Sequence, residues 1–546
     1  MTSAAPRRLD ALVVGAGFAG LCMLRRLREL GFSVRVFEAA AGIGGTWYWN
    51  RYPGARCDTE SLQYSYQFCE RLQREWQWSE RFAAQPEILR YINHVADRFD
   101  LRRDIEFNTR IAGARYDEAA GDWSLATADG RTIRARYCIM ATGCLSAPLT
   151  PAIDGLDDFA GERYYTSAWP HREVSFAAKR VGVVGTGSSA IQAIPLIAAE
   201  ARRLYVFQRT ANYSVPAHNG PLDPGYERDF KARYAENRAR AKELVSGFLC
   251  HYNRQSAFEV GAEQRRREYD ARWAHGGLAF LGAFSDITHD AEANRTATGY
   301  IHDRIREIVD DPEVAELLIP NSVVGCKRLC VDTDYYGTYN RDNVTLVDVR
   351  SSPIERITPA GVVVAGREYR LDTLVLATGF DAVTGALKRI DIRGRGGLAL
   401  ADKWRDGAGS YLGLGVAGFP NLFTITGPGS PSVLTNMLPS IEQHVDWIAE
   451  CLDHMRESGL AVIEPTVEAQ DGWVAYNEET ARGTLRYDCN SWYLGSNVPG
   501  RPRVFMPFVG GLPLYIEKCR EIVADGYRGF AFEPLHHTRG TAAPVA

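Results

Sequence analysis

The sequence lacks two features that would place it among membrane or nucleic-acid-binding proteins. It has no window of about 18 uncharged apolar residues, so we expect no membrane span. It has no long basic block and carries a net charge of −4, which argues against a nucleic-acid partner. What is present is ordinary: 546 residues, 45% hydrophobic and 24% charged, which suffices for roughly two to four globular domains.

We expect no secretory leader, and no CxxC motif occurs. The N-terminal MTSAAPRRLD precedes a short apolar run, ALVVGAGFAG, that fits a strand and a glycine turn better than a signal peptide. The 11 cysteines are scattered, and an odd number without a leader predicts free thiols in a reducing cytoplasm. We assign no metal site.

The first glycine-rich turn, GAGFAG, has the spacing Gly15-x-Gly17-x-x-Gly20. A strand-like run precedes it, a helix-like run follows, and the next strand-like run ends at Glu38. This βαβ context predicts a dinucleotide site, in which the glycines allow the turn, the approach of a pyrophosphate and close helix packing. The pyrophosphate would lie at the helix N-terminus, and Glu38 would accept hydrogen bonds from a ribose. The alternative is a glycine turn without a ligand.

The stretch GIGGTWYWNRYPGARCDTES, residues 42–61, indicates which dinucleotide binds there. It resembles flavoprotein monooxygenases, in which a second glycine turn and a Trp–Tyr run pack beside FAD. The resemblance assigns these residues as neighbours of the flavin: Gly44, Gly45, Thr46, Trp47 and Tyr52. It also assigns Asp58, Tyr64 and, far along the chain, Met437 to cofactor binding. A structural aromatic loop is the alternative.

A second glycine-rich turn, GTGSSA, begins at Gly185, and alanine at its third position is an accepted variant. Arg209 stands where the first unit has Glu38. A carboxylate there would repel a 2′-phosphate, whereas an arginine fork pairs with one, so the site predicts NADPH. The residues assigned to NADPH here are Gly185, Thr186, Gly187, Ser188, Ser189, Arg209 and Thr210. A solvated surface charge is the alternative for Arg209.

Two ATG turns, in IMATGCLS and VLATGF, mark the expected crossings between nucleotide domains. We predict an α/β fold with two Rossmann-like dinucleotide-binding domains, for FAD and NADPH, and a helical insertion. The predicted limits are 1–145 and 385–546 for the FAD domain, 155–215 and 328–382 for the NADPH domain, and 216–327 for the insertion. The insertion is rich in Arg, Glu and Ala, which indicates exposed helices with solvating charge. The tail from about residue 529 is expected to be disordered.

Disulfide reductases also combine two dinucleotide sites, but they need a redox cysteine pair beside the flavin. Cys326 and Cys330 are spaced CxxxC and fall beside the NADPH half of the chain, not after the first glycine turn. We therefore do not assign them as a redox dithiol.

The stretch FAGERYYTSAWP resembles the fingerprint of type I Baeyer–Villiger monooxygenases, Phe-x-Gly-x-x-x-His-x-x-x-Trp-Pro. Phe159, Gly161, Trp169 and Pro170 match, and Tyr165 stands at the histidine position. Further similar stretches span nearly the whole chain: WNRYPGARCD, GTGSSAIQ, KRLCVDTDYYGTYNRDNV, LATGFDAVTGAL, GPGSPSVLTNM and SWYLGSNVPGRPRVFM. They are most similar to the phenylacetone and steroid monooxygenase branch.

The resemblance implies that NADPH reduces FAD, that O2 adds at the flavin C4a, and that the peroxide attacks a ketone to give an ester or lactone, with sulfoxidation as a further activity. The attacking peroxide and the adduct it forms carry negative charge. The resemblance assigns the cation beside that charge to Arg328, which stays protonated, and the carboxylate that orients Arg328 to Asp58. Lys327 would share the 2′-phosphate with Arg209. A structural ion pair remains the alternative for Arg328, and an N-cap for Asp58.

The resemblance also places Trp492 near the nicotinamide ribose. It assigns a substrate-lining loop: Ser432, Val433, Leu434 and Met437. Core packing is the alternative for Trp492, Leu434 and Met437. Tyr165 keeps an aromatic body and one hydroxyl but loses the second ring nitrogen of histidine and its titration near neutral pH. We expect Tyr165 to preserve domain packing and to change NADPH affinity or domain movement.

Two rival functions share the nucleotide sites. Oxidation of amines or sulfides needs no Arg328–Asp58 pair, and a flavin-binding sensor would turn over no ketone. The pair favours ketone oxidation. The physiological ketone is not readable from the sequence, and we expect a monomer or weak oligomer.

Overall fold

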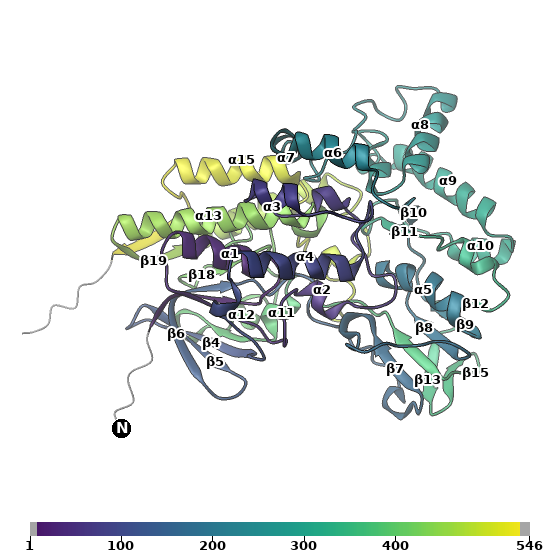
Figure 1. Cartoon of the computed structure of the whole chain (residues 1–546), viewed down its shortest axis with the longest axis horizontal. Helices are drawn as coiled ribbons and strands as arrows, with labels where there is room; N and C mark the ends of the chain where they lie inside the picture. Colours follow the sequence, from purple (N-terminus) through teal and green to yellow (C-terminus); the bar gives the residue numbers. More distant parts are fainter. Residues whose placement is uncertain (1–7, 535–546) are drawn as a thin grey trace, which may run out of the picture.

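The computed structural model describes residues 8–534, and its two largest sheets lie side by side (Figure 1). The larger sheet has the strand order β17-β4-β5-β6-β1-β2-β3, and β18 also pairs with β6. Its strands are β1 (Leu9–Val14), β2 (Val34–Phe37), β3 (Ile105–Glu106), β4 (Ile111–Asp117), β5 (Asp122–Thr127), β6 (Thr132–Met140), β17 (Asp391–Arg393) and β18 (Leu422–Thr424). The β3-β2-β1-β6 part is parallel, whereas β4, β5 and β6 form an antiparallel meander.

Helices cover the parallel part of this sheet. The three apolar positions predicted on one helix face, Leu21, Leu24 and Leu27, are fully buried on α1. The helices of this half are α1 (Phe18–Glu29), α2 (Thr46–Trp49), α3 (Glu70–Glu75), α4 (Gln85–Arg98), α11 (Gly385–Lys388), α12 (Leu400–Lys403), α13 (Met437–Glu457), α14 (Val467–Arg482) and α15 (Gly511–Ala524). The long α13 and α15 lie with α1 above the sheet in Figure 1.

The expected disorder from about residue 529 is wrong for residues 530–534. β20 (Phe530–Pro534) pairs antiparallel with β19 (Leu460–Pro465), because alternate residues of its FAFEP run pack beside the apolar core. Residues 535–546 lie outside the described part of the chain.

The second sheet is fully parallel, with the order β12-β9-β8-β16-β7. Its strands are β7 (Glu162–Tyr165), β8 (Arg180–Val184), β9 (Arg203–Gln208), β12 (Val344–Asp348) and β16 (Thr373–Leu376), with α5 (Ser188–Glu200) packed on them. Small sheets flank it: β10 (Ser214–Pro216) with β11 (Cys330–Asp332), and β13 (Ile354–Thr358), β14 (Gly361–Val364) and β15 (Arg367–Arg370).

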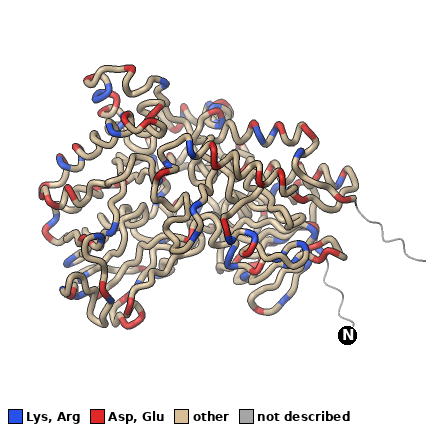
Figure 2. Tube along the Cα trace, turned by 180° about the vertical axis from the view of Figure 1, so that it is seen from behind, with Lys and Arg blue, Asp and Glu red and all other residues tan. Residues whose placement is uncertain are grey.

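The segment between β10 and β11 is helical. Its helices are α6 (Pro224–Ala232), α7 (Tyr234–Lys242), α8 (Ala262–His275), α9 (Ala291–Ile308) and α10 (Pro312–Leu318). Figure 2 shows charges of both signs along these helices. The expectation that the charge only solvates a surface is wrong for Arg238 and Arg272, which are 7% and 6% exposed because they bond to backbone carbonyls inside the protein. Among residues 8–534, no helix has the length and apolarity needed to cross a membrane.

Candidate functional site

The first glycine turn is built as a close approach between backbone segments. A Cβ on Gly20 would lie 1.8 Å from the Gly15 carbonyl oxygen, so only glycine fits there. Gly17 faces Gly45 of the second turn, where a Cβ on Gly45 would lie 3.0 Å from the Gly17 Cα. The N-terminus of α1 follows Gly17 and has no side-chain cap, which leaves its N–H groups free for an anion.

Glu38 is 6% exposed and closes this turn from the side. Its carboxylate accepts one hydrogen bond from the Ala16 amide and one from the Ala40 amide, each at 2.7 Å. Each carboxylate oxygen keeps further acceptor capacity, so the geometry leaves room for the predicted contact with a ribose.

An aromatic wall stands beside the N-terminus of α1. The Trp47 indole donates a hydrogen bond to the Tyr64 hydroxyl at 3.1 Å, and the Tyr64 ring packs edge-on against Phe18 with centroids 5.6 Å apart. Burial raises the pKa of Tyr64. Thr46, the first residue of α2, is exposed beside this wall. The structure therefore brings together the predicted neighbours of the flavin, although an aromatic wall of this kind also serves packing.

Tyr52 and Gly54 lie where the first half of the molecule meets α5 of the second. The Tyr52 hydroxyl donates to the Gln192 side-chain carbonyl at 2.9 Å, and burial raises its pKa to about 12. A Cβ on Gly54 would lie 2.3 Å from the Gln192 backbone oxygen. Tyr52 thus joins the two halves of the molecule, a contact that sequence reasoning did not predict because Gln192 has no local signal.

The second glycine turn leaves open space in front of its helix. Gly185 has φ +107°, and a Cβ there would lie 2.5 Å from the Ala377 carbonyl oxygen. A Cβ on Gly187 would meet nothing within 4 Å, and α5 begins there without a side-chain cap. A pyrophosphate fits such a turn, as it does the first. Thr186 donates to the Thr210 carbonyl at 2.8 Å, which ties the turn to the end of β9.

Lys327 and Arg209 are neighbouring cations. Burial lowers the pKa of Lys327, and the nearby Arg209 lowers it further. Arg209 is exposed, and neither side chain forms an ion pair with a carboxylate of residues 8–534. Two cations without such a partner suit a phosphate dianion.

The two cysteines of the CxxxC spacing lie apart in their contacts. The Cys330 sulfur is 3.2 Å from the Ser188 hydroxyl, and burial raises its pKa to about 11. Cys326 instead hydrogen-bonds toward Cys489, and all 11 cysteines are free thiols. The arrangement does not form a dithiol beside the first glycine turn.

Arg328 and Asp58 form a bidentate ion pair across 270 residues of sequence. Arg328 Nε donates to Oδ2 at 2.5 Å and Nη2 donates to Oδ1 at 2.8 Å, while Nη1 donates to the Val433 carbonyl at 2.6 Å. Burial opposes the charge on Arg328, but the Asp58 carboxylate outweighs it and raises the arginine pKa. The side chains keep 26% and 24% exposure, so a ligand can reach the pair.

The predicted substrate loop is the η8 turn (Ser432–Leu434) followed by α13. Ser432 has φ +43°, an uncommon backbone for a non-glycine residue, and its buried hydroxyl has no hydrogen-bond partner among the described residues. Leu434 and Met437 are half-buried beside Val433. Because Val433 bonds Arg328, the loop and the ion pair form one site.

Trp492 opens the short η9 turn (Trp492–Leu494) and is half-buried. Its ring packs on Tyr493 with centroids 4.3 Å apart and joins a cluster with Ala382, Val383 and Met506. This position is compatible both with the predicted nicotinamide contact and with core packing.

The fingerprint stretch lies where the two halves meet. Phe159 is buried, and a Cβ on Gly161 would lie 2.5 Å from the Asp372 carbonyl oxygen. Tyr165 ends β7 and pairs with Leu376 of β16. The Trp169 amide then donates to the Trp49 carbonyl of α2 at 3.2 Å, and the half-buried Pro170 follows.

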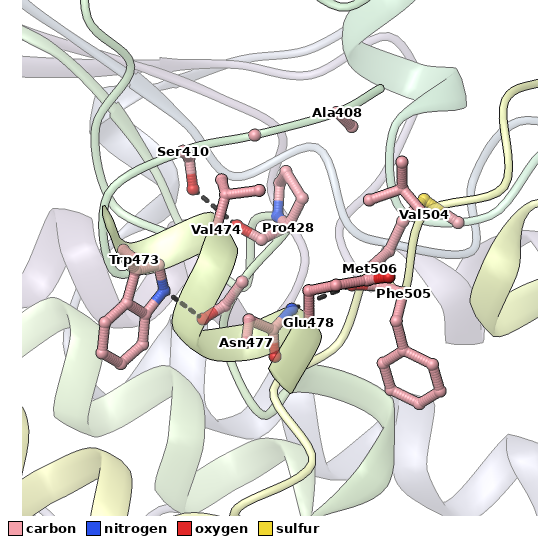
Figure 3. A pocket seen from close by; sticks show the side chains of 12 residues that line it. Ala408, Ser410, Pro428, Trp473, Val474, Asn477, Glu478, Val504, Phe505 and Met506 are labelled. Atoms are coloured by element: carbon pink, nitrogen blue, oxygen red, sulfur yellow. Dashed lines mark hydrogen bonds between the residues drawn. The ribbon is translucent and has the colours of Figure 1, made fainter. Parts of the chain in front are cut away.

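Figure 3 shows the side chains that line a separate narrow crevice, among them Trp473 and Met506. Its free volume is about 10 Å³. That is space for about one water molecule. Asn477 lines this crevice, and its side-chain amide donates to the Phe505 carbonyl at 2.8 Å. The crevice lacks Arg328 and Asp58 and is too small for a ketone.

Three residues that hold segments of the site were missed by sequence reasoning. Gln192 accepts from Tyr52, and Arg238 and Asn436 both donate to the Gln63 carbonyl, five residues after Asp58. Arg238 carried a usable signal, because Tyr234, Arg238 and Ala241 fall on one face of α7 and are buried together. Gln192 and Asn436 act through contacts between distant segments and leave no local pattern.

Comparisons with known proteins agree with this architecture. The family described as "Pyridine nucleotide-disulphide oxidoreductase" matches residues 12–246. An acetone monooxygenase (methyl acetate-forming) from Gordonia sp. (strain TY-5) is 44% identical over 528 residues, 96% of this chain and 99% of that protein. A Baeyer-Villiger monooxygenase from Pseudooceanicola batsensis is 43% identical over 522 residues, 95% of each chain.

Among solved structures, an oxidized steroid monooxygenase bound to NADP is 51% identical with a TM-score of 0.93, and the match covers 97% of this chain and 100% of that chain. The predicted α/β class with two dinucleotide-binding units is thereby confirmed.

Proposed function

The chain belongs to the flavin-dependent Baeyer–Villiger monooxygenases, enzymes that use FAD, NADPH and O2 to insert oxygen beside a ketone carbonyl, and we propose that Arg328 and Asp58 form its oxygenating site. The single observation that supports this most is the hydrogen-bond count of Arg328. A guanidinium has five N–H donors, and three are used within the described residues, by Asp58 and Val433. Two donors remain on a side chain that is a quarter exposed.

When bound, reduced flavin supplies the electrons that activate O2. The contribution of the chain is to hold a permanent cation where oxygen atoms gain negative charge. Asp58 fixes the guanidinium plane from one side and Val433 from another, so the two remaining N–H groups are oriented before a ketone arrives. Preorganised donors of this kind lower the barrier because they need no rearrangement during the reaction.

We propose that Lys327 and Arg209 hold the 2′-phosphate of NADPH and that the two uncapped helix N-termini, after Gly17 and Gly187, hold the pyrophosphates. Support comes from the closeness of the two cations and from the open space at Gly187. Glu38 supports the FAD ribose, and Trp492 the nicotinamide side, in the same proposal.

We propose that the substrate is a ketone with an aryl, cyclic or other bulky apolar group, with sulfides as a secondary class. Support comes from the apolar Val433, Leu434 and Met437 beside Arg328, and from the 51% identity to a steroid monooxygenase. The proposed domain limits, 1–145, 155–215, 216–327, 328–382 and 385–546, draw support from the two separate sheets. A cytoplasmic location, with free thiols, and a monomer or weak oligomer complete the proposal.

The test compares ester formation, NADPH oxidation and peroxide release in three variants with those of wild type. Arg328→Met removes the donors, and ester formation is expected to fall by roughly 10²–10³-fold, the usual effect of losing one such stabilising group. Asp58→Asn keeps the shape and removes the charge, so an intermediate loss is expected.

Arg180→Met is the matched control, because Arg180 forms the same bidentate pair with Asp372, at 3.0 and 2.6 Å, away from the site. If Arg328→Met and Arg180→Met lowered ester formation equally, Arg328 would be a structural ion pair and the proposal would fail.

A further inference from the structure

Arg238 of α7 is a buried cation whose partners are not carboxylates. Its Nη1 donates to the Gln63 carbonyl at 2.9 Å, and its Nη2 donates to the Leu62 carbonyl at 2.8 Å and to the Ser65 hydroxyl at 2.6 Å. Burial lowers the pKa of Arg238. A buried charge is costly unless its hydrogen bonds are satisfied. The carbonyls of residues 62 and 63 and the Ser65 hydroxyl satisfy Arg238, and Arg238 in turn fixes that loop.

The loop held by Arg238 is the one that carries Asp58. The short η1 turn (Ser61–Gln63) lies only a few residues after Asp58 and directly before Tyr64. Arg238 therefore fixes one end of a segment whose other end holds the Arg328 guanidinium.

Gln63 also connects to the substrate loop. Its carbonyl accepts a second hydrogen bond, from Asn436 Nδ2 at 2.8 Å. Asn436 lies three residues after Val433, whose carbonyl accepts a hydrogen bond from Arg328. The hydrogen bonds and short chain segments thus form a closed ring that passes through Asp58, Arg328, Val433, Asn436 and Gln63.

The helical insertion contacts both sides of this ring. The Gln63 side chain pairs with the Leu249 backbone, accepting from its amide at 2.5 Å and donating to its carbonyl at 3.3 Å. The backbone amide of Asn436 donates to the Ser246 carbonyl at 2.8 Å. Together with Arg238, these contacts hold Gln63 and Asn436, the two residues of the ring that lie opposite Arg328.

We propose that Arg238 is a positioning residue for oxygen insertion, through which the helical insertion sets the place of the Arg328 guanidinium. The inference rests on the proposed function of Arg328 and Asp58 and extends it to a residue that touches neither substrate nor cofactor. Loss of Arg238 removes its bonds to the Leu62 and Gln63 carbonyls and to Ser65, and leaves Gln63 with its bonds to Leu249 and Asn436. The ring then loosens on the Asp58 side, and Arg328 shifts relative to the reacting oxygen.

The experiment compares Arg238→Met and Arg238→Lys with Arg240→Met, a control on the exposed face of the same helix. The readouts are ester and peroxide formed per NADPH from a bulky ketone, and the anaerobic rate of flavin reduction by NADPH. In Arg238→Met, ester per NADPH is expected to fall on the order of tenfold, with peroxide taking its place, since a full 1 Å misplacement can cost on the order of 10²-fold. Flavin reduction should stay at the wild-type rate, Arg238→Lys should recover part of the ester, and Arg240→Met should match wild type.

A general folding defect would lower flavin loading and reduction together, whereas a positioning role changes only the fate of the oxygen. If Arg238→Met does not fold, Asn436→Asp is the second variant, because it keeps the Oδ1 that caps Leu438 and removes the donor to Gln63. Wild-type ester per NADPH in a folded Arg238→Met, or in Asn436→Asp, overturns the inference. Wild type that forms no ester from any ketone overturns the proposed function itself, and the inference with it.

Discussion

At the scale of single residues, two arginines meet the cost of a buried charge in different ways. Arg328 pairs with a carboxylate and keeps two N–H donors for a ligand. Arg238 donates to backbone carbonyls and to a hydroxyl of the loop that it holds. The first arrangement suits a group that meets a substrate, and the second suits a group that holds backbone in place.

Glu442 of α13 is the clearest titrating residue near Arg238. Burial raises its pKa from 4.5 to about 7, against the opposing effects of the Gln67 amide, Arg238 and Lys242. A raised pKa means that proton binding stabilises the folded state below about pH 4.5, and that this contribution is lost as the pH rises through about 7.

We expect the free energy of unfolding of wild type to fall relative to Glu442→Gln by about 3 kcal/mol across that window. The glutamine keeps an acceptor for the Gln67 and Phe68 amides, so the comparison isolates the charge. Denaturant unfolding of both proteins between pH 4.5 and 7.5 measures the difference. Parallel stability curves would show that Glu442 does not titrate in this range.

At the scale of elements, the contact of the Gly54 turn with α5 joins the two nucleotide units. Gly54 has φ +80°, and a Cβ there would lie 2.3 Å from the Gln192 carbonyl oxygen. Gly31 has nearly the same backbone, φ +79°, but open space around it. The pair separates the effect of backbone strain from the effect of contact.

Both alanine variants should lose about 1–2 kcal/mol from the left-handed backbone. Gly54→Ala should lose roughly 1–3 kcal/mol more from overpacking and should also weaken NADPH binding, because the turn is forced away from α5. Thermal unfolding and NADPH titration of the two variants provide the comparison. Equal NADPH affinity in Gly54→Ala and Gly31→Ala would mean that this contact does not position the NADPH unit.

The same scale shows which parts of the fold were open to prediction. The two glycine turns were predictable because their spacing and flanking strands are local, and the structure gives Gly15 and Gly185 the positive φ that such turns need. β20 was missed because it forms only by pairing with β19, a strand far away in the sequence. Within the candidate site, Arg328 and Asp58 were found through resemblance, whereas the bond from Asn436 to the Gln63 carbonyl joins residues 373 positions apart in sequence.

At the scale of the whole molecule, the two sheets are joined by a short antiparallel crossing and by the fingerprint stretch. In the crossing, the Leu149 amide donates to the Gly379 carbonyl at 3.1 Å, and the Asp381 amide donates to the Ala147 carbonyl at 2.8 Å. Tyr165 lies near this crossing, because it pairs with Leu376, three residues before Gly379. Tyr165 therefore lies close to a connection between the two units.

Tyr165 is half-buried against an apolar cluster that includes Phe159 and Val184, and its hydroxyl has no hydrogen-bond partner among the described residues. Packing is then its main role, so Tyr165→Phe should keep wild-type stability and NADPH affinity. Tyr165→His places a smaller, polar ring in the cluster and should cost about 1–2 kcal/mol of stability. It should also change NADPH affinity or the rate of flavin reduction, because the strand end that carries it leads directly to Trp169 and the contact with Trp49. NADPH titration, stopped-flow reduction and ester yield for both variants test this. If Tyr165→His left all three unchanged, the residue at the fingerprint position would have no part in coupling the two units of this enzyme.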